Sequence, residues 1–153
     1  TQRGYYILNL DGIVLEYGTV KNYGNGKFNE YVDMEVGDDG YYLLSKDGAV
    51  EVFGSMPFFG DTKGIRAIAL AITKNGYSIL EENGAIHFFG EVPKYGYEVL
   101  DELSARDIEI IPENNGYYVL DAHGNTYSYF AAAGFSGPEY SPEPKYIDLE
   151  LLS

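Results

Sequence analysis

The chain has 153 residues, 45% of them hydrophobic and 22% charged, which is enough to bury the core of one domain. Its 24 Asp and Glu against 10 Lys and Arg give a net charge of -14, which argues against nucleic acid and anionic membrane surfaces as partners. The absence of cysteine excludes disulfides and thiol catalysis, and no apolar run approaches the length needed for membrane insertion.

The first predicted element is a β-hairpin. Residues 4–10 form its first strand, Asp11-Gly12 its turn and residues 13–17 its return strand. Asp-Gly is a preferred pair of the type I′ turn, in which both central residues take a positive φ. The corresponding pairs further along are Asp47-Gly48, Asn83-Gly84 and His123-Gly124. We therefore expect the same turn four times.

This hairpin is one of four copies along the chain. The copies are anchored at Gly4, Gly40, Gly76 and Gly116, with spacings of 36, 36 and 40 residues. In all four, a Tyr follows the anchor by one residue, a Leu by four, a Gly by eight, and aromatic residues by thirteen and nineteen. A repeat of this period predicts a modular array in which each copy packs on its neighbours.

A separate strand is predicted ahead of every hairpin except the first. Residues 31–36, 68–72 and 106–111 precede the later hairpins, and a fourth such strand, residues 146–151, follows the last one. A ring explains why the strand missing at one end is present at the other. We therefore expect residues 1–153 to form a single all-β domain, a four-bladed β-propeller closed by the C-terminal strand pairing with the N-terminal hairpin. The aromatic segment that ends each copy would supply a fourth, outermost strand of the blade.

Residues 40–54, Gly-Tyr-Tyr-Leu-Leu-Ser-Lys-Asp-Gly-Ala-Val-Glu-Val-Phe-Gly, carry a resemblance that extends over nearly the whole chain. They resemble the propeller repeats of secreted bacterial cell-wall and surface proteins, although Tyr or Ser replaces the Trp of that pattern and Phe130 replaces one Gly. The resemblance implies binding or scaffolding and transfers no catalytic motif. The alternative fold is a hairpin solenoid like the choline-binding repeats, but their period is about half as long and they use Trp, which this chain lacks.

The strand ahead of the hairpins carries an Asp-x-Glu pattern. Asp33, Asp107 and Asp148 each precede a Glu by two residues, whereas alanines take both places in residues 68–72. Alternation puts each pair on one face of its strand. In related propellers this strand is innermost, so the acids should converge near the axis. They would then bind an axial Ca²⁺ or Na⁺ ion, accept N–H groups from the next blade, or be solvated at the channel mouth.

The 16 tyrosines suggest a sugar-stacking surface, because Tyr offers a flat apolar face with a polar tip. Most of them stand in repeat columns and should pack between blades. Tyr31, Tyr97, Tyr140 and Tyr146 lie outside the hairpin columns, where exposure is expected. Of these, Tyr97 and Tyr140 are the candidate ligand-binding residues.

The sequence indicates a non-catalytic binding or scaffolding module for a protein or carbohydrate ligand, monomeric as an isolated domain. It begins at Thr1 with neither an initiator Met nor a signal peptide, so we expect a piece of a larger exported protein. An extracellular or cell-surface location fits that expectation, and the lack of Cys suits the cytoplasm equally. The alternatives are an enzyme that uses the channel carboxylates and a purely structural spacer.

Overall fold

The computed structural model describes residues 3–97, 99–100, 104–111, 116–130 and 137–151. Within those ranges the secondary structure consists of strands, and no helix is long and apolar enough to cross a membrane. The strands are β1 (Gly4–Leu8), β2 (Val14–Gly18), β3 (Tyr31–Gly37), β4 (Gly40–Ser45), β5 (Val50–Gly54), β6 (Ala67–Thr73), β7 (Gly76–Glu81), β8 (Ile86–Gly90), β9 (Ala105–Ile110), β10 (Gly116–Asp121) and β11 (Thr126–Phe130).

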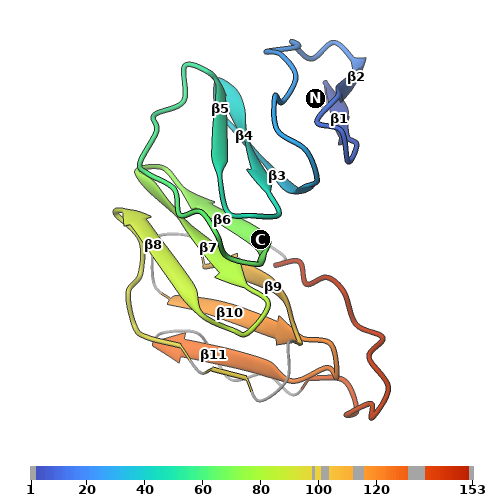
Figure 1. The fold of residues 1–153 in the computed structure, drawn as a ribbon, viewed down its shortest axis with the longest axis vertical. Helices are drawn as coiled ribbons and strands as arrows, with labels where there is room; N and C mark the ends of the chain where they lie inside the picture. The colour runs from blue at the N-terminus through green and yellow to red at the C-terminus, as the bar shows by residue number, and fades with distance from the viewer. Residues whose placement is uncertain (1–2, 98, 101–103, 112–115, 131–136, 152–153) are drawn as a thin grey trace.

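The strands form four separate antiparallel sheets, one for each repeat. Their orders are β1-β2, β3-β4-β5, β6-β7-β8 and β9-β10-β11. The predicted hairpins and the strands ahead of the last three hairpins are therefore confirmed. Figure 1 shows the sheets following one another along an arc, with the C-terminal segment returning from β11 to the middle of the molecule.

The hairpin turns differ from the predicted type I′. Gly12, Gly48, Gly84 and Gly124 have a positive φ, but the residue before each of them does not. In the second copy the N–H of Gly48 donates to the carbonyl of Ser45, and the N–H of Ser45 donates to the carbonyl of Ala49. This is a three-residue loop, a tight turn followed by a glycine bulge. The prediction was wrong because it took the Asp-Gly pair as the centre of the turn, whereas the glycine is the bulge residue that follows it.

Gly48 tests this geometry. Its φ is +95°, and an added Cβ would lie 2.1 Å from the carbonyl oxygen of Thr62. We expect Gly48→Ala to lower the free energy of unfolding by about 2 kcal/mol or more, because it combines a strained φ with a backbone clash. Gly64→Ala is the control: its φ is +80° but its Cβ meets open space. Chemical denaturation should show a smaller loss of unfolding free energy for Gly64→Ala than for Gly48→Ala. Equal losses would contradict the close packing of the turn at Gly48.

The Tyr that follows each anchor glycine links a sheet to the segment before it. Tyr41, Tyr77 and Tyr117 are fully buried. Their hydroxyls donate to the carbonyls of Gly24, Gly60 and Gly96, which stand at corresponding places in the loops. Burying a Tyr hydroxyl costs little free energy when it has a hydrogen-bond acceptor, and the bond also orients the ring. The repeat columns are therefore the packing contacts between successive sheets, as the sequence predicted.

Two kinds of predicted strand are not formed in the described residues. The aromatic segments after β2, β5 and β8 are not strands, so the sheets they follow have no fourth, outermost strand, and the corresponding segment that ends at Phe135 lies outside the described residues. Residues 146–151 are not a strand either, and the β1-β2 sheet has only two strands. The closing pair would join the two ends of the chain, whereas β3 is linked to β4 by Asp38 and Asp39 alone. Pairing the two ends costs the most chain entropy.

Candidate functional site

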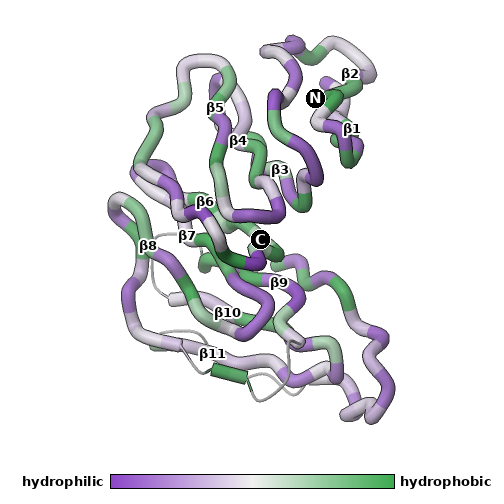
Figure 2. The backbone as a smooth tube through the Cα atoms, in the orientation of Figure 1, coloured by the Kyte–Doolittle hydropathy of each residue, from purple (hydrophilic) through white to green (hydrophobic). Residues whose placement is uncertain are grey.

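The acid pairs stand on β3, on β9 and on the C-terminal segment. β3 and β9 each contain an irregularity just before the Asp, where Val32 and Arg106 have no paired residue in the register. β6 has the same irregularity, but it carries Ala69 and Ala71, and Figure 2 shows it as hydrophobic over most of its length. The repeat therefore places the acid pairs of β3 and β9 at matching points of their sheets.

Two of the aspartates tie their sheet to a later part of the chain. The Oδ2 atom of Asp33 accepts the N–H of Leu70 on β6 at 2.7 Å, and the Oδ2 atom of Asp107 accepts the N–H of Leu149 at 2.8 Å. In each case Oδ1 accepts the N–H of the residue that follows the aspartate. For Asp33 this confirms the hypothesis that these acids accept N–H groups from the next blade, and Asp107 makes the same kind of bond to the C-terminal segment. The chemistry is that of a structural link between sheets.

The acids also lie close enough to perturb one another. Burial, and after it the charges of Asp33, Glu109, Asp107 and Glu150, raise the pKa of Glu35 to about 9. Burial raises the pKa of Asp33 to about 6, against the lowering effect of its two N–H donors. Three chain segments therefore bring carboxyl groups together, as the sequence predicted, and several of them are protonated near neutral pH.

Two further carboxyl groups carry raised pKa values. Burial and then the charges of Glu150 and Asp148 raise the pKa of Glu109 to about 7. The pKa of Asp107 is raised by burial and by a hydrogen bond to the carboxyl group of Asp148. A hydrogen bond between two carboxyl groups requires that one of them is protonated. Protons therefore offset part of the repulsion within the cluster.

In the described part of the chain, no group of three or more His, Asp or Glu residues is arranged to hold a metal ion. The axial Ca²⁺ or Na⁺ at Asp33, Asp107 and Asp148 accordingly stays a prediction. Asp148 is exposed, whereas Asp33 and Asp107 are half-buried. The cluster is therefore open to solvent on the side of the C-terminal segment.

Both candidate tyrosines are exposed, as the sequence predicted. Tyr97 is 45% exposed in the segment before β9, and Tyr140 is 63% exposed after β11. The ring of Tyr140 stacks on His123, with the ring centroids 5.4 Å apart. The expected exposure of Tyr31 was wrong: it is 2% exposed, and its hydroxyl bonds to Glu51. A slot between Gly12 and Gly26 holds its ring, and that slot is made by residues distant in sequence.

Sequence comparisons identify no relative: no family model matches, and no curated protein matches. Solved structures do share the fold. The computationally designed Ika4 protein aligns with a TM-score of 0.59 at 14% identity, over 86% of this chain and 88% of its own. The computationally designed Ika8 protein aligns with a TM-score of 0.58 at 15% identity, over 92% of this chain and 48% of its own. The chain thus spans about half the length of Ika8.

At this identity the likeness shows the fold alone. The fold and its neighbours define an all-β protein built from four repeated antiparallel sheets. None of the comparisons points to bacterial cell-wall repeats, so that resemblance rests on residues 40–54 and their copies.

Proposed function

We propose that the chain is a non-catalytic binding or scaffolding module. The observation that carries this proposal is the use made of the axial acids. Asp33 and Asp107, which an enzyme would need free for acid-base chemistry, each accept two backbone N–H groups and do so in the same way at two places. A catalytic carboxyl pair is asymmetric, with one member protonated and the other free to react. Hydrogen bonds that recur at equivalent places of the repeat favour a structural role for these acids instead.

We further propose that the four sheets close into a four-bladed propeller. The N–H of Tyr146 donates to the carbonyl of Ala122, as the N–H of Tyr31 donates to Leu10 at the first hairpin. The ring of Tyr146 also packs on Gly124 as that of Tyr31 packs on Gly12. The C-terminal segment therefore enters the repeat as an inner strand would, although it is not paired.

The open face of the first sheet supports the same closure. It carries four apolar side chains that are all more than 40% exposed, namely those of Tyr5, Ile7, Leu15 and Tyr17. Tyr41 and Leu43, the repeat equivalents of Tyr5 and Ile7, are fully buried against the preceding repeat. A ring would cover the open face with the fourth sheet.

The ligand class is a protein or a carbohydrate, bound by loops at one rim of an extracellular or cell-surface domain. A glycan array and a panel of glycosidase substrates, both applied to the purified chain, test the proposal. We expect saturable binding without turnover. Hydrolysis that is lost in Asp107→Asn, with the thermal melt retained, would support the enzyme alternative. Absence of any ligand on the array and on a protein array would support the spacer.

Metal dependence decides the role of the axial acids. If carboxyl groups there bind Ca²⁺, the melting temperature should rise in millimolar Ca²⁺ and fall in excess EDTA, by mass action. If the N–H donors and bound protons satisfy them, neither addition should shift the melt. Thermal scans at pH 8 separate the two, with Asp33→Asn as the variant that should abolish any Ca²⁺ response.

A further inference from the structure

A pocket of about 520 Å³ lies where the turn of the β4-β5 hairpin meets the loops that lead into β3 and β6. Its volume is in the range of small-molecule sites. Two loops supply residues 27–30 and residues 63, 65 and 66, and the turn supplies residues 46, 47 and 49. The pocket is thus assembled from two successive repeats, away from the axial acids.

The pocket is basic in a strongly acidic protein. Lys27, Lys46, Lys63 and Arg66 line it, which is four of the ten Lys and Arg in the sequence, against Glu30 and Asp47 as its acids. The neighbouring pocket at the turn of the first hairpin is lined by Asp11 and Asp33 and by no base. The concentration of positive charge is therefore particular to this place and is not a property of the repeat.

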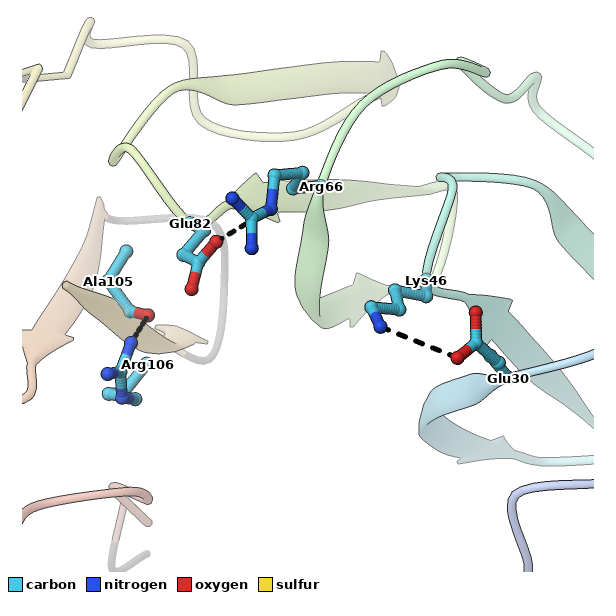
Figure 3. A network of polar contacts seen from close by, with 6 residues as sticks. All are labelled: Glu30, Lys46, Arg66, Glu82, Ala105 and Arg106. Atoms are coloured by element: carbon cyan, nitrogen blue, oxygen red, sulfur yellow. Dashed lines mark hydrogen bonds and ion pairs between the residues drawn. The ribbon is translucent and has the colours of Figure 1, made fainter. Parts of the chain in front are cut away.

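Two of the four cations are already paired, and two are not. Lys46 lies 3.5 Å from Glu30, and the Nε atom of Arg66 lies 2.9 Å from Glu82, as Figure 3 shows. Within the described residues, Lys27 and Lys63 form no ion pair with a carboxylate. Both are exposed and stand 36 residues apart, at the same position of successive repeats. They are the charges available to an anion.

An aromatic ring stands beside these cations. Phe28 is 41% exposed, and the Nζ atom of Lys63 lies 5.9 Å from the centre of its ring. The loop is held in place because the N–H of Lys27 donates to Glu51 and the N–H of Phe28 donates to the hydroxyl of Tyr31. The equivalent residue in the next repeat is Gly64. The fold therefore does not require an aromatic side chain at this position.

We propose that this pocket binds an acidic saccharide, one whose sugar rings carry carboxylates. The assignment deepens the proposed binding function and rests on it. A uronic acid joins an apolar ring face and a carboxylate in one rigid unit, which suits an exposed Phe ring next to unpaired ammonium groups. In an acidic peptide the carboxylates sit on flexible side chains, which lose more conformational freedom on binding.

The probe is trigalacturonate, compared by calorimetry with its methyl ester and with a triglutamate peptide. The wild-type chain should bind trigalacturonate at least about ten-fold more tightly than either, and binding should weaken as salt rises. Lys27→Glu with Lys63→Glu should abolish the preference. Phe28→Ala should weaken both saccharides, charged and neutral.

The control carries Lys74→Glu with Lys94→Glu, which makes the same change in net charge at exposed lysines outside the pocket. It should bind trigalacturonate within about two-fold of wild type. Equal losses in both double variants, equal binding of triglutamate, or no binding of trigalacturonate would each overturn the assignment. A glycan-array ligand that is insensitive to Lys27 and Lys63 would overturn it while leaving the proposed binding function intact.

Discussion

Removal of residues 146–153 is expected to unfold the chain or drive it to aggregate at physiological temperature. The deletion takes away the ring of Tyr146 from Gly124 and the N–H of Leu149 from Asp107. It leaves the carboxyl group of Asp107 without one of its two N–H donors and the turn at Gly124 without the ring that covers it, each of which costs about 1–3 kcal/mol. Against a total stability of about 5–15 kcal/mol for a small domain, this loss is large. Circular dichroism melts and gel filtration measure it.

A milder variant separates the hydrogen bond from the rest of the segment. Leu149→Pro removes the N–H that Asp107 accepts, and it also replaces the Leu side chain and fixes φ. Ile147→Pro is the matched control, because Ile147 is 76% exposed and no bond of its N–H is found within the described residues. We expect a fall in melting temperature for the first and little change for the second. A truncated chain that melts like wild type would rule out both the ring and a structural role for this segment.

The free energy of unfolding is expected to fall as the pH rises from about 4.5 to 9. The pKa of Glu35 is about 9 in the folded chain, and those of Glu109 and Asp33 are about 7 and about 6, each above its ordinary value. The folded state therefore holds protons that the unfolded state releases. The contribution of such groups to the free energy of unfolding is fully present below their pKa values in the unfolded chain. It is lost as the pH rises through their pKa values in the folded chain.

Glu35→Gln isolates this effect, because the amide keeps the shape of the protonated acid. We expect it to raise the free energy of unfolding by about 2 kcal/mol at pH 7 and to leave it unchanged near pH 4.5. Glu139→Gln, at an exposed position, makes the same change in net charge and should have little effect. Denaturation curves at several pH values measure both. A pH-independent gain in Glu35→Gln would contradict a titrating carboxyl group.

The repeat made most of the sheets predictable. A Tyr, a Leu and a Gly at fixed distances from each anchor mark strand, core and turn, and these constraints act within one hairpin. The turn type was wrong because a single bulge shifts the glycine out of the turn centre. The burial of Tyr31 and the failure of residues 146–151 to pair depend on contacts with distant parts of the chain, which the local pattern does not contain.

The candidate site was also predictable only in part. The Asp-x-Glu pattern predicted that acids from three segments meet, and the effect of these acids on one another's pKa values confirms it. The basic pocket was not predicted from the sequence, because its side chains come from two loops and a turn that are separate in the chain. One signal was present, since Lys27 and Lys63 stand one repeat apart. A charge that recurs at the repeat period outside the packing columns can therefore indicate a binding site between successive repeats.

Because β6 carries alanines where β3 and β9 carry acids, alkaline solution should destabilise some contacts between sheets more than others. Ala69 and Ala71 pack with Ile108 of β9 in one apolar cluster, and β6 itself contains no carboxyl group. Loss of protons in alkaline solution would therefore increase the repulsion between the carboxylates of β3, β9 and the C-terminal segment and leave the apolar contact between β6 and β9 in place. Amide hydrogen exchange should then be slowest in these two strands, which would form the last cooperative unit to open.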